Sequence, residues 1–255
     1  MIPVPHLSII VPAYREERRI GESIQKIAQF LLSQDYASEL IVVDDGSTDD
    51  TARVAALAAR AAAASPRLAF ALLVNGRNRG KGFSVRRGMH ACSGDFALFT
   101  DADLSTPIEE WDRFAHRHDA GADVCIGSRA LADSTIELHQ SWVREHMGKT
   151  FGALKALAGL HGIPDSQCGF KSFNRRAREL LFSRQRLDRF AFDVELLLLA
   201  QHLQLCVEQI PIRWRNSAAT TVNPARDSAR MIIDLARIRR GFRRHLYRLP
   251  PAVPS

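Results

Sequence analysis

Two carboxylates one residue apart, Asp101 and Asp103, follow directly after the apolar run Phe96–Thr100. Only the small Ala102 separates them, so both can turn toward one hard cation, and such cations prefer oxygen ligands. A magnesium or manganese ion held there would act as a Lewis acid on a departing diphosphate. The alternative is an acidic loop before the helix expected after Thr106, where carboxylates serve as caps. On their own, the two carboxylates leave both interpretations open.

A second acidic pair, Asp44 and Asp45, closes the apolar run that begins at Leu40. Carboxylates in this place can accept hydrogen bonds from a ribose hydroxyl or from a base N–H group. The alternative is an acidic turn that caps the next helix, a role for which Asp49 and Asp50 are better placed.

A basic loop flanked by glycines, at residues 78–82, precedes a helical pattern. Gly80 and Gly82 would let the backbone approach a phosphate, and Lys81 would add positive charge near a helix N-terminus. The glycine spacing is not that of a P-loop, and a surface turn is the alternative.

Hydrophobic periodicity predicts the elements that position these groups. Strands are expected at residues 7–11, 40–43, 68–74, 96–100, 124–127, 169–173 and 205–212. Helices are expected at residues 16–32, 52–64, 82–91 and 142–160, with two more between 173 and 205. This alternation predicts an α/β fold with a mostly parallel, doubly wound sheet, whose ligands bind beyond the carboxyl ends of the strands. The polar clusters after the first, second and fourth strands meet only if those strands are parallel neighbours.

The composition is that of one globular domain. A chain of 255 residues, 46% hydrophobic and 25% charged, can bury a substantial core. No apolar run reaches the roughly 18 residues of a membrane-spanning helix, and the first residues lack a signal-peptide pattern. The four cysteines are too scattered for a metal site and fit reduced thiols, which favours a cytoplasmic protein.

The net charge of +7 is concentrated near the C-terminus, where eight arginines lie between residues 226 and 248. Apolar residues alternate with them at helical spacing, which predicts a basic amphipathic helix at residues 226–249 on the surface of an anionic membrane. A solvated helix face is the alternative, and the scarcity of aromatic residues disfavours nucleic acid. Residues 250–255 are expected to be disordered. The apolar residues of this helix are Met231, Ile232, Leu235, Ile238, Phe242 and Leu246.

Taken together, these segments resemble the inverting family 2 glycosyltransferases of the GT-A fold. The residues that carry the resemblance lie at 11–16, 43–49, 78–82, 101–104 and 127–129. Residues 165–171, 192–195 and 211–214 look like the dolichyl-phosphate glucosyltransferase branch of that family. Arg15 departs from the family pattern, which usually has Asn at this position.

The resemblance implies a Rossmann-like GT-A domain over residues 1–225, with a nucleotide-binding half at 7–130 and an acceptor half at 131–225. It implies a metal site at Asp101 and Asp103. Asp193 becomes the first candidate for a catalytic base and Asp165 the second, with a helix N-cap as the alternative role of Asp193. The residues expected to bind the donor and its phosphates are Pro12, Ala13, Tyr14, Glu16, Asp44, Asp45, Lys81, Asp101, Ala102, Arg129 and Lys171.

The function that the resemblance implies is transfer of a hexose, with glucose from UDP-glucose favoured, to a polyprenyl phosphate with the help of Mg²⁺ or Mn²⁺. GDP-mannose as donor, a soluble sugar acceptor, and a nucleotide-sugar-binding protein without activity are the alternatives. A nicotinamide oxidoreductase is disfavoured because the first strand leads into Pro12, Ala13 and Tyr14 and not into a glycine-rich dinucleotide fingerprint.

Overall fold

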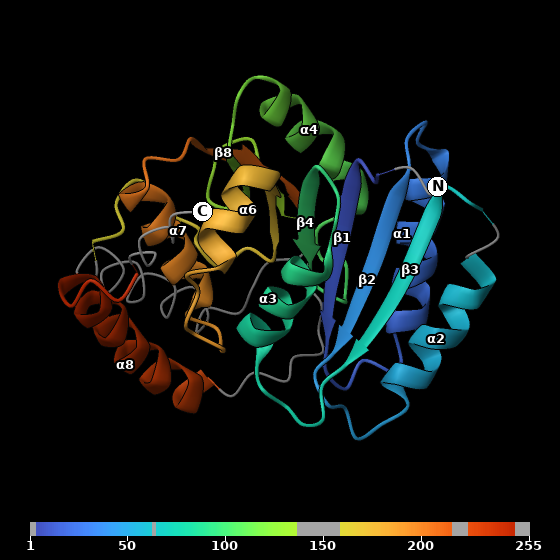
Figure 1. Cartoon of the computed structure of the whole chain (residues 1–255), viewed down its shortest axis with the longest axis horizontal. Coiled ribbons are helices and arrows are strands. Elements are labelled where there is room, and N and C mark those ends of the chain that lie inside the picture. The colour runs from blue at the N-terminus through green and yellow to red at the C-terminus, as the bar shows by residue number, and fades with distance from the viewer. Residues whose placement is uncertain (1–3, 63–64, 137–158, 216–223, 248–255) are drawn as a thin grey trace, which may run out of the picture.

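A seven-stranded sheet, with strands in the order β3-β2-β1-β4-β7-β5-β8, forms the centre of the protein (Figure 1). The computed structural model describes residues 4–62, 65–136, 159–215 and 224–247. The strands of this sheet are β1 (Leu7–Ala13), β2 (Ser38–Asp44), β3 (Leu68–Val74), β4 (Phe96–Thr100), β5 (Val124–Ser128), β7 (Phe170–Asn174) and β8 (Val207–Pro211). A small second sheet pairs β6 (Thr135–Ile136) with β9 (Arg213–Trp214).

Helices cover both faces of the sheet and bury one apolar cluster on each side. Successive residues of a strand point to opposite faces, so Ile9 packs on the side of α1 and α2 while Ile10 packs under α3. This is the predicted α/β class with a mostly parallel sheet. The helical elements are α1 (Ile20–Ser33), α2 (Thr51–Ala62), α3 (Lys81–Ala91), a short 3-10 turn (Ile108–Glu110), α4 (Trp111–Asp119), α6 (Arg175–Phe182), α7 (Phe192–His202) and α8 (Pro224–Arg243).

Strand β7 is the one reversal within this sheet, because it runs antiparallel to both of its neighbours, β4 and β5. Its register pairs Phe170 with Thr100 and Lys171 with Phe99. The beginning of β7 therefore lies at the same edge of the sheet as the end of β4. Through β7 and β8, the second predicted half of the chain shares the sheet of the first half.

Some sequence predictions lie outside the described residues: nearly all of the helix expected at 142–160, and the disordered end at 250–255. Three of the four cysteines are buried and Cys206 is exposed. Within the described part of the chain, no helix combines the length and the apolar character needed to cross a membrane.

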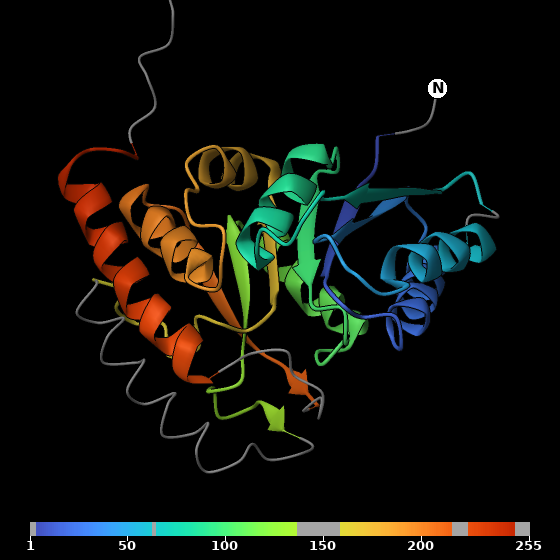
Figure 2. The ribbon, with the colours of Figure 1, turned by 90° about the horizontal axis from the view of Figure 1, so that it is seen from below.

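The C-terminal helix α8 is amphipathic as predicted, but its apolar stripe has a different use. Helix α8 lies beside α7 (Figure 2). Its residues Leu235 and Ile238 are buried in the core, and Phe242 packs against the same cluster. The expectation that these residues face lipid is therefore wrong, because the protein core already covers them. Ile232 and Ile233 are the apolar residues that α8 leaves about half exposed, at 50% and 54%.

Two turns at the carboxyl edge of the sheet place a residue other than glycine in the left-handed backbone region. Arg15, just after β1, has φ of 57°, and Leu104, after β4, has φ of 46°. This conformation crowds the side chain of most residues, whereas Asn tolerates it because of its short polar side chain. The position of Arg15 therefore favours Asn, the residue usual in the resembled family.

Replacing Arg15 with Asn should raise the free energy of unfolding by about 1 kcal/mol, because it relieves the crowding at positive φ. Urea unfolding of the free protein measures this change. Arg18→Asn is the matched control, since Arg18 is an exposed residue nearby that is not among those at positive φ. Equal effects of the two substitutions would contradict the backbone explanation.

Candidate active site

The carboxyl ends of β2, β1 and β4 lie side by side, as the convergence of the predicted clusters requires. β1 is the middle strand of the three, and Ala13 at its end pairs with Asp44 at the end of β2. The next residue, Asp45, donates its backbone N–H to the oxygen of Ala13 at 2.8 Å. Residues from distant parts of the chain thus meet at one edge of the sheet.

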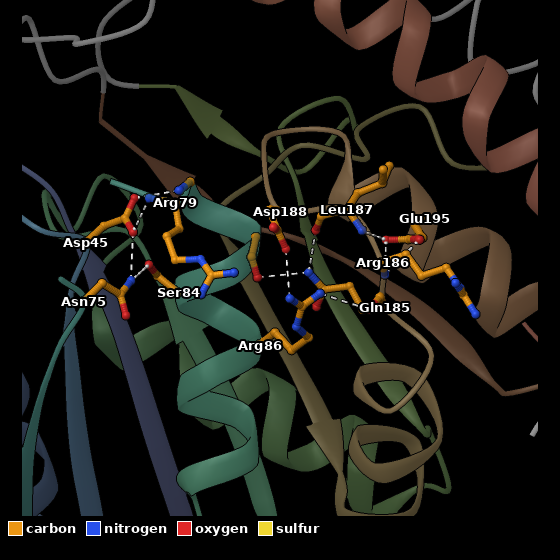
Figure 3. A network of polar contacts seen from close by, with 12 residues as sticks. Asp45, Asn75, Arg79, Ser84, Arg86, Gln185, Arg186, Leu187, Asp188 and Glu195 are labelled. Carbon is orange, nitrogen blue, oxygen red and sulfur yellow. Dashed lines mark hydrogen bonds and ion pairs between the residues drawn. The ribbon is translucent and has the colours of Figure 1, made fainter. Parts of the chain in front are cut away.

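The buried carboxylate of Asp45 holds the loop at residues 78–82, called here the basic loop. It accepts hydrogen bonds from the side-chain amide of Asn75 at 2.8 Å, the backbone N–H of Arg79 at 3.0 Å and that of Gly80 at 2.7 Å (Figure 3). Asp44, also buried, accepts longer bonds from the N–H of Ser47 at 3.3 and 3.4 Å. In the free protein, therefore, Asp45 organises the basic loop.

Close packing requires the two glycines of the basic loop. A Cβ on Gly80, whose φ is +110°, would overlap the backbone oxygen of Asp188. A Cβ on Gly82 would lie 2.8 Å from the oxygen of Leu187 and 2.7 Å from Cβ of Phe192. The segment before α7 fills the space that side chains would need.

Lys81, at the start of α3, forms an ion pair with Asp101 beyond the end of β4. Its Nζ lies 2.5 Å from Oδ1 of Asp101. Burial alone would lower the pKa of the Lys81 ammonium, but the carboxylates of Asp101 and Asp193 outweigh it and raise that pKa. This ion pair joins the basic loop to the turn that carries Asp101.

The turn that carries Asp101 and Asp103 is held at three points. Ser23 of α1 donates to the backbone oxygen of the buried Ala102 at 2.6 Å, and the N–H of Ser105 donates to Oδ1 of Asp103 at 3.0 Å. A Cβ on Gly169 would overlap the carboxylate of Asp101, so a larger residue there would require the Asp101 side chain to shift. The side chains of Asp101 and Asp103 remain 40% and 20% exposed, and ligands can reach both.

These two carboxylates form a partial donor set for a cation. Among the described residues, no group of three His, Cys, Asp or Glu side chains is placed to hold a metal ion. Mg²⁺ commonly binds through one or two carboxylates, substrate phosphates and water, and a pair such as Asp101 and Asp103 fits that mode. The residues present therefore fit a cation that binds together with a diphosphate.

Arg129, directly after β5, forms a bidentate ion pair with Asp165. Its Nε and Nη2 each lie 2.7 Å from a different oxygen of Asp165, and its backbone N–H donates to the same carboxylate at 2.9 Å. Burial opposes ionisation of Asp165, but these bonds and the charge of Arg129 outweigh it and lower the pKa. The guanidinium also lies 5.4 Å from the centre of the Trp214 ring.

Lys171 of β7 and Asp193 of α7 form a third ion pair, in which both side chains are buried. Nζ of Lys171 lies 2.6 Å from Oδ1 of Asp193 and 2.5 Å from the backbone oxygen of Cys168. Burial raises the pKa of Asp193, although the charges of Lys171 and Lys81 oppose this. Asp193 lies in the first turn of α7 after the N-cap residue Ala191, so its alternative role as the N-cap is wrong.

The remaining predicted residues, at the end of β1, form the rim of this edge. Tyr14 is half-buried, while the carboxylate of Glu16 pairs with Arg19, whose Nη2 donates to Oε1 of Glu16 at 3.0 Å. Nη1 of Arg19 also lies 3.9 Å from Oδ2 of Asp103. Pro12, half-buried, and Ala13, buried, complete the end of the strand.

Sequence reasoning assigned no role here to Arg19, Ser23 or Asn75. Arg19 and Ser23 lie in a sequence pattern typical of an ordinary helix. Asn75 follows β3 and belongs to none of the motifs identified in the sequence. The signal that could have found them is position, because each lies near a carboxyl end of the parallel strands.

Comparisons with known proteins agree with this geometry. A model of the family described as "Glycosyl transferase family 2" matches residues 8–182. A dolichyl-phosphate beta-glucosyltransferase of Dictyostelium discoideum is 33% identical over 92% of this chain and 74% of its own length. One from Trichomonas vaginalis is 32% identical over 95% of this chain and 73% of its own length.

A solved structure of glucosyl-3-phosphoglycerate synthase from Mycobacterium tuberculosis, with Mn²⁺ and uridine-diphosphate-glucose, has the same fold. It covers 93% of this chain and 80% of its own, with a TM-score of 0.66 and 20% identity. The matched family model spans more than half of this chain, and the relatives align over most of both sequences. The protein is therefore a glycosyltransferase that belongs to glycosyl transferase family 2.

Proposed function

We propose that the protein transfers glucose from UDP-glucose to dolichyl phosphate or a related polyprenyl phosphate, with inversion at the anomeric carbon. The observation that carries this proposal is the Lys81–Asp101 ion pair, which joins the basic loop to the Asp101 turn at the carboxyl edge. A diphosphate at this edge meets both a fixed ammonium and two carboxylates that fit a cation. The names of the relatives support glucose as the sugar and dolichyl phosphate as the acceptor.

The donor half of the site is assigned to the basic loop and to the ends of β1, β2 and β4. Asp101 and Asp103 would hold Mg²⁺ or Mn²⁺, which when bound supplies Lewis-acid stabilisation of the leaving diphosphate. Lys81 adds positive charge from the protein itself, and fixed charge of this kind stabilises a leaving group without reorganisation. Tyr14 and Asp44 lie toward the β2 side of the edge, where the nucleoside would bind.

The acceptor half is assigned to the end of β5 and the beginning of β7, which lie at the same edge of the sheet. A phosphate acceptor is already an anion, so it needs positioning and positive charge more than it needs deprotonation. Arg129 offers a planar guanidinium whose orientation is set by both oxygens of Asp165, and such a group suits phosphate. Lys171 adds a buried positive charge close by.

Of the two candidate bases, Asp193 is the better one for an acceptor that must lose a proton. Burial raises its pKa, whereas Arg129 engages both oxygens of Asp165 and keeps the pKa of that carboxyl low. With a phosphate acceptor, Asp193 would act as the counter-charge that holds Lys171 in place.

The exposed face of α8 is proposed to bind an anionic membrane surface, at which the lipid acceptor is met. Ile232 and Ile233 are about half exposed, and Arg240, Arg243 and Arg244 are exposed farther along the chain. Apolar and basic side chains together favour peripheral binding to anionic lipid, and each basic residue near the surface contributes about 1 kcal/mol. Because the cytoplasmic leaflet carries anionic lipids, we propose that the protein acts at the cytoplasmic face of a membrane.

Incubation of the protein with polyprenyl phosphate and Mn²⁺ should yield glucosyl polyprenyl phosphate from UDP-glucose, and far less mannosyl product from GDP-mannose. Thin-layer chromatography of radiolabelled lipid products measures both reactions. Omission of the lipid controls for hydrolysis of the donor. Faster transfer from GDP-mannose would contradict the proposed donor, and transfer only to a soluble sugar would contradict the proposed acceptor.

Asp103→Asn should lower kcat about 100-fold or more and abolish the Mn²⁺-dependent gain in UDP affinity, because it removes a carboxylate from the proposed cation site. Calorimetric titration of UDP with and without Mn²⁺ measures binding apart from turnover. Asp119→Asn, an exposed aspartate at the end of α4, is the matched control. Near wild-type activity and Mn²⁺ response in Asp103→Asn would show that the metal assignment is wrong.

The double substitution Ile232→Glu and Ile233→Glu should abolish binding to vesicles of phosphatidylcholine and phosphatidylserine, because it places two negative charges on the proposed contact face. Vesicle flotation measures the bound fraction. Leu57→Glu, an exposed leucine on α2 that is 53% accessible, is the control. If wild-type protein fails to float with these vesicles, or if both variants float as well as wild type, the membrane assignment fails.

A further inference from the structure

Glu195 is a fully buried carboxylate on α7 for which the proposed reaction has no use. Its oxygens accept hydrogen bonds from the backbone N–H of Arg186 at 3.1 Å and of Leu187 at 2.9 Å, and from the hydroxyl of Tyr247 at 2.8 Å (Figure 3 shows the two backbone partners). Burial raises its pKa, and these bonds partly offset that effect. A buried acid with three donors from two distant segments joins those segments.

One of those segments is the turn that follows α8. Tyr247 packs with its ring against Gly241, where a Cβ would lie 2.7 Å from Cε2 of the tyrosine, and against the ring of Phe242 at 4.6 Å. Arg184, two residues after α6, also holds this turn, since its Nε donates to the backbone oxygen of Tyr247 at 3.0 Å. The hydroxyl of Tyr247 is thereby aimed at Glu195.

The other segment, residues 185–188, connects α6 with α7 and supports the start of α3. The side-chain amide of Gln185 donates to the backbone oxygen of Gly82 at 2.9 Å, and Phe83 donates its backbone N–H to the oxygen of Asp188 at 3.0 Å. Arg86 donates to the carboxylate of Asp188 at 2.8 Å and to the backbone oxygen of Gln185 at 3.0 Å (Figure 3).

Residues 185–188 are closely packed against the basic loop. A Cβ on Gly80 would overlap the oxygen of Asp188, and a Cβ on Gly82 would lie 2.8 Å from the oxygen of Leu187. A displacement of residues 185–188 must therefore move the basic loop or break its contacts. Lys81 lies between these two glycines, and its ammonium pairs with Asp101.

We infer that Tyr247 is a positioning residue for the basic loop, and that it acts through Glu195 and residues 185–188. The loop is thus held from two sides: Asp45 fixes it from β2, and the Tyr247–Glu195 contact fixes it through the segment before α7. Loss of the tyrosine hydroxyl leaves Oε1 of Glu195 with one of its two donors, the backbone N–H of Arg186 at 3.1 Å, and we expect residues 185–188 to shift in response. The effect on donor binding rests on the proposed function, in which this loop contacts the diphosphate.

A consequence is that the carboxylate of Glu195 links the turn after α8 to the segment that supports the basic loop. Tyr247 lies in the turn that follows α8, so a change in the position of this turn reaches Lys81 through a continuous chain of packed and hydrogen-bonded groups. Such a chain can couple two sites when both bias the same element, here residues 185–188.

Tyr247→Phe tests this inference, because it removes the hydroxyl and keeps the ring that packs on Gly241. We expect faster amide hydrogen exchange at residues 79–83 in the free protein, and a rise of about five- to tenfold in the Kd of UDP and in KM of the donor, with little change in kcat. Tyr36→Phe is the matched control: its hydroxyl accepts a hydrogen bond from Trp111 at 3.1 Å, and it precedes β2, at the amino edge of the sheet.

A merely structural role would lower the unfolding temperature in both tyrosine variants and leave hydrogen exchange of the basic loop unchanged, which would overturn the inference. Glu195→Met supplies a second test, because it removes both acceptor oxygens, whereas glutamine would keep one. If Tyr247 acts through Glu195, the effect of Tyr247→Phe on loop exchange must be smaller in the Glu195→Met background. Full additivity of the two substitutions would refute the proposed route.

Because hydrogen exchange is measured without nucleotide, the experiments distinguish failure of the proposed donor site from failure of the positioning role of Tyr247. If wild-type protein does not bind UDP but Tyr247→Phe still loosens the basic loop, the donor assignment is wrong and the positioning role stands. In the opposite case, UDP binds, and both its Kd and the hydrogen exchange of the basic loop are the same in Tyr247→Phe and Tyr36→Phe. The positioning role is then wrong and the donor assignment stands.

Discussion

The need to pair charge at the carboxyl edge of the sheet constrains the rest of this structure. Three basic side chains from the basic loop, β5 and β7 each contact a carboxylate from another element. An isolated buried charge costs several kcal/mol, and each of these pairs offsets part of that cost. The edge is thereby charged in both signs before any substrate arrives, as a diphosphate, a cation and a phosphate acceptor would require. The pairs are Lys81–Asp101, Arg129–Asp165 and Lys171–Asp193.

The reversed strand β7 brings residues of the acceptor half to the carboxyl edge of the sheet. Because it runs antiparallel to β4, its first residues lie beside the last residues of β4. Gly169 then lies against the carboxylate of Asp101, and Lys171 lies within reach of Asp193 on α7. Helix α7 extends this connection. Asp193 pairs with Lys171, and Glu195, two residues farther along, binds the segment that supports the basic loop.

Much of the fold and the donor half could be predicted because local patterns carry them. The apolar runs and their polar ends located the parallel strands, and parallel neighbours bring their carboxyl ends together. The insertion of β7 between β4 and β5 was not predictable from periodicity, since it depends on contacts distant in sequence. For the same reason, only the structure revealed three further features: the buried partner of Lys171, the packing role of Gly80 and the burial of Leu235 on α8.

The central claim is that carboxylates from separate strands surround one divalent cation and one diphosphate. A crystal structure of the protein with UDP and Mn²⁺, with anomalous scattering recorded at the manganese edge, tests it most directly. The account predicts one anomalous peak in contact with the Asp103 carboxylate and the diphosphate, with Lys81 contacting a phosphate oxygen. A peak elsewhere, or UDP bound away from the carboxyl ends of β1, β2 and β4, would contradict it.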